Sequence, residues 1–309
     1  MENVWAQSRT IVPLVRELAA DTETPISVYL KLRGLGPSFL LESVEGGEHL
    51  ARYSMIGTQP RAIVRSWGRR VVVEQEGSWR ESALPEGDVL DVLRALMPRY
   101  EETAGADLPR FSGGAVGYLG YDLVRLFETL RSESPPKGPL PEAIFMICDR
   151  LVICDHVKHR LLVIAHAEAG NSASHREAEA ALAEMVARLH RPLPESAPGT
   201  EKTPLVDEPF YSAFDRQSFE QAVRSIKEHI AAGDVFQCVL SRRKGRRTDA
   251  RPFDIYRALR RVNPSPYMFY LELPDGLRLV GSSPEVLVRL DGGIVESRPL
   301  AGTRPRGNS

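Results

Sequence analysis

The sequence lacks an excess of charge of either sign: 40 lysines and arginines are balanced by 41 aspartates and glutamates, for a formal net charge of −1. A nearly neutral chain has no overall field that attracts nucleic acid or an acidic membrane. The sequence also lacks any run of about 18 apolar residues, which excludes a transmembrane helix. Its first residues, Met1–Trp5, lack the basic and apolar blocks of a signal peptide. We therefore expect neither nucleic acid nor a membrane as a partner.

Cysteine is scarce, with Cys148, Cys154 and Cys238 as the three in 309 residues. An odd and scattered set does not make a disulfide framework, and its spacing matches no zinc site. We interpret all three as small buried hydrophobic residues. Such a set fits the reducing cytoplasm better than an oxidising compartment, so we expect a cytoplasmic protein.

What the sequence does contain is a series of short apolar runs, with few helices between them. Alternation and turn residues predict strands at 26–32, 38–43, 63–67, 70–74, 143–148, 151–154, 160–165, 235–241, 267–273, 277–280, 286–290 and 294–298. Helical periodicity predicts helices at 89–97, 175–190, 215–233 and 252–262. Because no βαβ alternation repeats, the pattern predicts an α+β fold with mainly antiparallel sheets.

A change of composition suggests a domain boundary. Residues 191–209 are rich in proline and cannot sustain a helix or a central strand, so we predict a linker there. Residues 10–190 would form an N-terminal domain, and residues 210–309 would begin a second one. The second block opens with a helix capped by Asp215 and stopped by Gly233, with one apolar stripe from Phe219 to Ile230.

Three patterns resemble functional sites, but a structural interpretation is favoured for each. The basic run Arg242–Arg247 lacks interleaved aromatic residues, so it is interpreted as a solvated strand end and not as a nucleic-acid site. The glycine-rich run Gly113–Asp122 lacks the strand, helix and acid of a dinucleotide fingerprint, which favours tight packing. His156 and His159 lie in a turn where only Asp155 offers a further ligand, which disfavours a metal site.

Two other patterns are better candidates. Gly302 and Thr303 lie among Arg298, Arg304 and Arg306, a set whose backbone N–H, hydroxyl and guanidinium groups suit a small dicarboxylate. The segment 263–269 holds two prolines before an apolar aromatic strand. It is either a rigid loop that leads into the core or one wall of an apolar site.

Seven blocks, taken together and in order, resemble the large subunit of anthranilate synthase, a chorismate-utilising enzyme. They are residues 40–43, 113–122, 155–160, 233–241, 263–269, 281–285 and 298–307. The resemblance spans nearly the whole chain. It implies antiparallel sheets packed as a sandwich with flanking helices.

The resemblance also implies a reaction, in which chorismate and ammonia give anthranilate and pyruvate in the first step of tryptophan synthesis. It implies Mg2+ on the substrate carboxylate and a glutamine amidotransferase subunit that supplies the ammonia. Gly302 and Thr303 are expected to contact chorismate. The tryptophan feedback site is expected to comprise Ser43, Pro266, Tyr267 and Met268, with Glu42 and Asn263 as neighbours.

Family members continue past the segment that resembles this chain, and the resemblance assigns the magnesium ligands and the catalytic histidine to that further part. We therefore expect no catalytic residue and no metal ligand in residues 1–309. We also expect residues 210–309 to be incompletely buried and prone to aggregate.

Two alternatives stay open: a catalytically inactive fragment that binds tryptophan and the partner subunit, and an enzyme of the aminodeoxychorismate synthase type. Ala301 favours anthranilate as the product. Aminodeoxychorismate synthases often carry a lysine at this position, which acts as a nucleophile, and alanine has no such chemistry.

Overall fold

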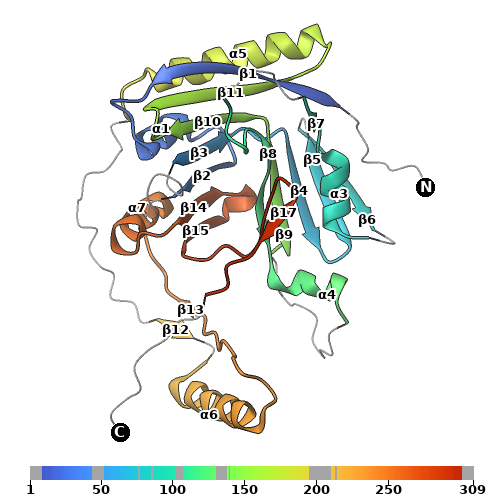
Figure 1. Cartoon of the computed structure of the whole chain (residues 1–309), viewed down its shortest axis with the longest axis vertical. Coiled ribbons are helices and arrows are strands. Elements are labelled where there is room, and N and C mark those ends of the chain that lie inside the picture. Colours follow the sequence, from blue (N-terminus) through green and yellow to red (C-terminus); the bar gives the residue numbers. More distant parts are fainter. Residues whose placement is uncertain are drawn as a thin grey trace. The chain divides into compact units, whose positions relative to one another are not determined.

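The computed structural model describes residues 9–43, 52–75, 77–84, 87–101, 107–129, 138, 140–194, 210–212 and 214–300. The chain divides into two compact units, one made of residues 1–197 and 252–309, the other of residues 198–251. The first unit holds two large sheets with helices packed outside them, which confirms the predicted α+β class (Figure 1). Among the described residues, no helix is both long enough and apolar enough to cross a membrane.

The larger sheet has eight strands, and every described pair in it except β1 with β7 is antiparallel. In spatial order they are β15 (Arg278–Ser283), β14 (Tyr267–Glu272), β2 (Ser38–Glu42), β3 (Tyr53–Thr58), β10 (Arg150–Asp155), β11 (Arg160–Glu168), β1 (Thr10–Ala19) and β7 (Arg99–Tyr100). Strands from the two ends of the chain are therefore neighbours in one sheet.

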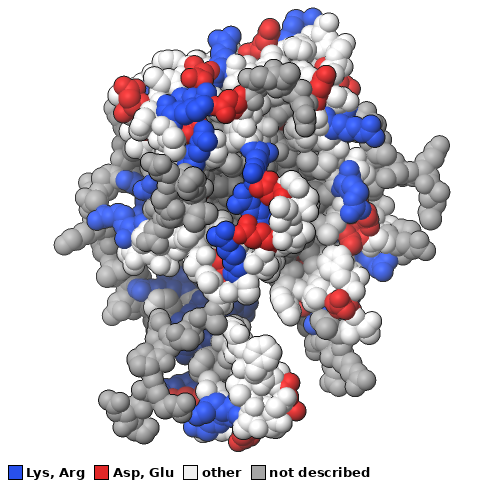
Figure 2. Space-filling view, viewed as in Figure 1, with Lys and Arg blue, Asp and Glu red and all other residues white. Residues whose placement is uncertain are grey.

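The smaller sheet of this unit has five antiparallel strands. In spatial order they are β6 (Ser78–Ala83), β5 (Arg70–Gln75), β4 (Ala62–Trp67), β9 (Ala143–Cys148) and β8 (Gly114–Leu119). The β4–β5 hairpin turns at Gly68 and Arg69, as predicted, and Gly68 has a φ of 57°. On the face that Figure 2 shows, basic and acidic side chains are intermixed, which agrees with the balanced composition.

Successive residues of a strand point to opposite faces of the sheet, so neighbouring side chains of β2 enter two different apolar clusters. Phe39 joins an apolar cluster with Ile63 and Leu151, which belong to β4 and β10, so this cluster lies between the two sheets. Leu40 joins a second cluster, beneath the helices. The predicted sandwich with flanking helices is confirmed.

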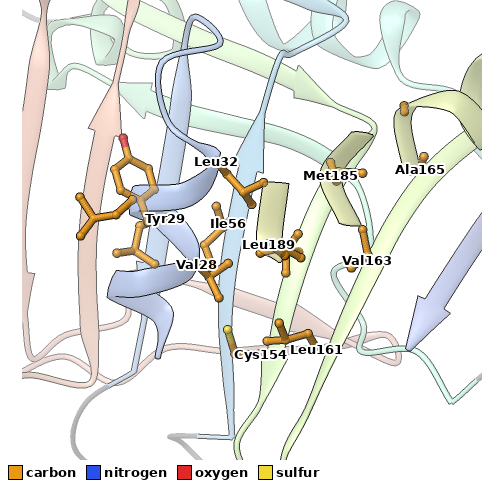
Figure 3. Close-up of a cluster of buried hydrophobic side chains, with 14 of the residues drawn as sticks. Val28, Tyr29, Leu32, Ile56, Cys154, Leu161, Val163, Ala165, Met185 and Leu189 are labelled. Carbon is orange, nitrogen blue, oxygen red and sulfur yellow. The ribbon is translucent and has the colours of Figure 1, made fainter. Parts of the chain in front are cut away.

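Three helices cover the outer face of the eight-stranded sheet: α1 (Pro25–Leu32), α5 (Ser172–Leu189) and α7 (Pro252–Val262). Figure 3 shows Val28 and Leu32 of α1 and Leu189 of α5 gathered in one cluster with Ile56 and Leu161 of the sheet. Helix α3 (Val89–Leu96) packs on the five-stranded sheet in a separate cluster. Helix α4 (Val124–Phe127) is a single short turn after β8.

The strand predicted at 26–32 is wrong, because this segment forms helix α1. Thr24 caps the helix: its Oγ1 accepts the N–H of Ser27 at 3.1 Å, and the Ser27 Oγ accepts the N–H of Thr24 at 2.8 Å. Pro25, with its fixed φ, occupies the first turn. Alternating apolar residues suggested a strand, but the capping residues decide the local structure.

The second unit contains α6 (Arg216–Ala232) and a short pair of strands, β12 (Tyr211–Ser212) and β13 (Lys244–Gly245). Asp215 caps α6 by accepting the N–H of Ser218 at 2.8 Å, and Gly233 ends the helix with a φ of 84°, as predicted. The strand predicted at 235–241 is wrong: this segment is irregular, and Phe236 is 94% exposed. A strand needs a partner for its backbone, and no described strand pairs with this segment. Cys238 is also exposed, whereas Cys148 and Cys154 are buried as predicted.

The compact units group the chain differently from the predicted ranges 10–190, 191–209 and 210–309, which follow composition and not contacts in space. Incomplete burial of residues 210–309 is confirmed for α6, which has no buried residue, and for the exposed hairpin of β16 (Arg289–Asp291) and β17 (Ile294–Glu296). It is wrong for α7 and β14, because Tyr256 and Met268 are at most 1% exposed.

The glycine-rich run 113–122 has a structural role, as predicted. It supplies β8, and at Gly117 an added Cβ would lie 1.8 Å from the carbonyl oxygen of Ile144 in the neighbouring strand. The atom in the way belongs to the backbone and cannot rotate aside. Gly114 has a φ of 137°, a value that side chains rarely adopt.

We predict that Gly117→Ala lowers the free energy of unfolding by about 1–3 kcal/mol, the usual cost of forcing an extra carbon into a packed site. The matched control is Gly138→Ala, where the nearest atom to an added Cβ is 4.0 Å away. Chemical denaturation of the two variants measures the difference. Equal stabilities would contradict the close approach of β8 and β9.

A buried histidine lies where the chain passes from one sheet to the other. Asp149 alone separates β9 from β10, and its carbonyl accepts both the backbone N–H and the ring Nδ1–H of His166, each at 3.0 Å. Because a carbonyl only accepts, Nδ1 carries the proton and Nε2 is left as an acceptor. Nε2 is buried and has no hydrogen-bond partner among the described residues, and His166 lines a cavity of about 60 Å³. Burial lowers the pKa of His166 below its ordinary value of 6.5.

This lowered pKa predicts loss of stability on acidification. The unfolded chain takes up the His166 proton near pH 6.5, whereas the folded chain does so only at lower pH, so unfolding is favoured as the pH falls below about 6.5. His166→Asn keeps a donor for the Asp149 carbonyl but does not titrate. We expect its melting temperature to fall less than that of the parent between about pH 7.5 and about pH 5.5. Parallel decreases in the two proteins would contradict the assignment.

Candidate functional site

The candidate site is built on the pairing of β2 with β14. Met268 is the partner of Glu42 in this antiparallel pair, and the register continues to Glu272 opposite Ser38. Five of the residues predicted from sequence, Glu42, Ser43, Pro266, Tyr267 and Met268, therefore meet at one end of two adjacent strands. The structure brings together segments that lie more than 200 residues apart, since Arg260 and Glu42, which form an ion pair here, are separated by 218 positions.

The predicted residues do not all point the same way. Met268 and Glu42 are 1% and 5% exposed and lie on the side of the sheet that α7 covers. Tyr267 precedes Met268 in the strand and so points to the opposite side, where 36% of it is exposed. Ser43 and Pro266 are half-buried at the ends of the two strands. At this end of the β2–β14 pair, the predicted residues therefore lie on both faces of the eight-stranded sheet.

Glu42 is a buried carboxylate held by helix α7. Its Oε2 accepts the hydroxyl of Tyr256 and, at 3.1 Å, the Nε–H of Arg260. Only 1% of the Glu42 side chain is exposed, so these bonds act in a medium that screens charge weakly. Burial, followed by the nearby Glu42 carboxylate, raises the pKa of Tyr256, so its hydroxyl stays protonated and donates.

The loop that follows α7 is tied to β15. The N–H of Asn263 donates to the carbonyl of Leu259 at 2.8 Å, which continues the helical bonding to the loop. The Ser282 hydroxyl lies 2.6 Å from the Asn263 carbonyl and 2.7 Å from the Ser265 hydroxyl. Because a hydroxyl has one proton, Ser282 donates to Asn263 and accepts from Ser265. The loop therefore reaches Tyr267 in a fixed position.

His156 lies beside the same strands and has a structural partner. Its Nε2 is 2.8 Å from the hydroxyl of Ser54, the residue that pairs with Glu42 in β3. Burial lowers the pKa of His156, against the opposing effect of the Glu42 carboxylate. Among the residues that the structure describes, no group of three His, Cys, Asp or Glu side chains gathers to hold a metal ion.

The other predicted site lies largely outside the described residues, because Gly302 and Thr303 belong to the segment 301–309. The segment that leads to it can be followed as far as Leu300, whose N–H donates to the Glu285 carboxylate at 3.1 Å. The Ser283 hydroxyl in turn accepts the N–H of Glu285 at 3.2 Å. Two blocks of the resemblance, 281–285 and 298–307, are thus connected directly.

Sequence reasoning missed three residues of the β2–β14 end: Tyr256, Arg260 and Ser282. Tyr256 and Arg260 lie on α7, whose amphipathic pattern predicted a helix but gave no sign of a carboxylate partner 214 and 218 positions away. Ser282 belongs to the block 281–285 of the family resemblance, but no neighbouring residue indicates its bond to Asn263. In all three cases the contact joins segments that are distant in the sequence, so only the folded structure reveals it.

Comparison with known proteins gives consistent results. Residues 36–309 match the family model described as chorismate binding enzyme. The chain is 38% identical over 314 residues to anthranilate synthase component 1 of Acetivibrio thermocellus, which covers 99% of this chain and 62% of that protein. It is 40% identical to the protein of the same name from Pseudomonas aeruginosa, over 96% of this chain and 60% of that protein.

A solved structure agrees with these sequences. The crystal structure of anthranilate synthase component I from Streptococcus pneumoniae TIGR4 matches with a TM-score of 0.64 and 28% identity, over 90% of this chain and 59% of that one. This chain therefore spans about three fifths of the length of the relatives that it matches. The family model covers most of the sequence, and the fold agrees with that of a member, so the chain belongs to the chorismate binding enzyme family.

Proposed function

We propose that the chain is the chorismate-binding component of an anthranilate synthase, or the corresponding portion of one. The reaction is the conversion of chorismate and ammonia into anthranilate and pyruvate, the first step of tryptophan synthesis. Support comes from the family match over residues 36–309 and from relatives named anthranilate synthase component 1 at 38–40% identity. A glutamine amidotransferase partner is the proposed source of ammonia, and Mg2+ the proposed cofactor.

We further propose that tryptophan binds at the end of the β2–β14 pair and inhibits the reaction. The observation that carries this proposal is the register that sets Met268 against Glu42, next to Ser43. Pro266, Tyr267 and Met268 give apolar and polarizable surface that suits an indole ring, whereas Ser43 and the Asn263 neighbourhood offer polar groups for an amino acid head group. Chorismate is proposed to bind at Gly302 and Thr303, beyond the bond between Leu300 and Glu285.

Turnover tests the proposed reaction. The chain should be completed with the remaining residues of the Acetivibrio thermocellus relative, because the family's metal and proton-transfer residues are expected there. We expect this protein to form anthranilate, measured by its fluorescence, from chorismate, Mg2+ and ammonium. The intact relative is the positive control.

Three results of this assay have distinct meanings. Formation of aminodeoxychorismate without pyruvate would support the alternative enzyme class and contradict the proposal. No turnover beside an active control would favour a catalytically inactive binding fragment. Anthranilate formation by the 309-residue chain alone would show that the expectation of no catalytic residue in this segment is wrong.

Tryptophan binding tests the proposed regulatory site in the 309-residue chain. We expect isothermal calorimetry to detect binding of L-tryptophan, and Ser43→Leu to weaken it by about 10-fold or more, which corresponds to about 1.4 kcal/mol. The added bulk would fill space beside Met268 where the ligand is proposed to lie. Ser78→Leu, on an exposed edge strand of the other sheet, is the matched control. Unchanged affinity in Ser43→Leu would exclude this location.

A further inference from the structure

Helix α7 is connected to the strands that carry the proposed tryptophan site in two places. Side chains from its last two turns bind Glu42, and the loop that follows the helix is bound by Ser282. Tyr256 and Arg260 are one helical turn apart and reach the same oxygen of Glu42, the last residue of β2. Three residues after Arg260, Asn263 begins the loop that Ser282 of β15 holds. The helix therefore connects the end of β2, on one side, with the start of β14, on the other.

The first connection is strong because it is buried. Tyr256 is completely buried and its ring stacks on Phe253, with 5.7 Å between centroids, so the position of its hydroxyl is determined by apolar packing. Arg260 supplies a charge-assisted bond at 3.1 Å to a carboxylate that is almost entirely removed from water. If either donor is removed, the buried Glu42 Oε2 loses one of its two hydrogen bonds, and this loss raises the free energy of the folded state.

The carboxylate has little freedom as a result. Both donors bind Oε2, and both come from a helix whose own position depends on the Tyr29, Phe253 and Tyr270 ring cluster. A change in Glu42 is transmitted to Ser43 directly, since the two are consecutive in the chain. A change in α7 is transmitted to Pro266 through the short loop that starts at Asn263.

We propose that Tyr256 and Arg260 are positioning residues for tryptophan binding, a role that rests on the proposed function of the β2–β14 end. They hold Glu42, and thereby fix Ser43 relative to Pro266, Tyr267 and Met268. Neither residue needs to touch the ligand. Their effect on affinity comes from the geometry just beyond the paired strand ends, so loss of either donor lets Ser43 shift relative to Pro266 although the β2–β14 ladder itself remains.

The test compares variants of the full 309-residue chain by calorimetry with L-tryptophan. We expect Tyr256→Phe, which removes one oxygen and keeps the ring packing, and Arg260→Gln to raise the dissociation constant by about 10-fold each. Arg260→Lys keeps the charge but not the planar fork, so its affinity should lie between those of the parent and Arg260→Gln. The matched control is Arg261→Gln on the same helix, because Arg261 is exposed; it should bind like the parent.

Thermal unfolding of the same samples separates positioning from a merely structural role. Positioning predicts weaker binding in protein that is fully folded at the temperature of the titration. A lower melting temperature in Tyr256→Phe and Arg260→Gln with unchanged affinity would overturn the proposal. A parent chain that binds no tryptophan would overturn the proposed regulatory site, and this inference with it, whereas binding by the parent with equal affinity in all variants would overturn this inference alone.

Discussion

The antiparallel pairing of β14 with β2 is the constraint on which most of the first unit depends. It places Leu271 and Leu273 in the cluster between the sheets, and Met268 and Tyr270 in the cluster beneath the helices. A segment from late in the chain thus completes both cores that the early strands begin. Helix α7 is held over the sheet by the same pairing, because the loop at Asn263 leads directly into β14. Without this pair, the candidate site would not be assembled and α7 would not be held over the sheet.

Polar contacts inside this unit specify geometry more than they add stability. The Glu42 carboxylate must lose its water to be buried, and its bonds to Tyr256 and Arg260 offset that cost only while their geometry is good. An apolar residue at position 42 would fill the same space without this requirement. A buried acid with two donors from one helix therefore selects a single arrangement of that helix on the sheet.

Local features of the fold were predictable from sequence, and features that depend on distant partners were not. The β4–β5 turn at Gly68, the Asp215 cap and the Gly233 stop follow from a few adjacent residues. Thr24, Pro25 and Ser27 are typical of a helix start, but the apolar alternation of residues 26–32 favoured a strand prediction for α1. The segment 235–241 has strand composition and no described partner. In the candidate site, the family resemblance predicts Ser43 and residues 266–268. Tyr256 and Arg260 can be identified only from their contacts with Glu42 in the folded chain.

The distance along the chain between β2 and its partner has a consequence during synthesis. Strand β2 ends at Glu42 and β14 begins at Tyr267, so at roughly 5–20 residues per second the ribosome needs roughly 11–45 s to supply the strand that pairs with the open edge of β2. Throughout that interval Phe39, Leu40 and Leu41 belong to an open strand edge with apolar side chains on both faces. The nascent chain is thus exposed to wrong pairing until its late strand arrives.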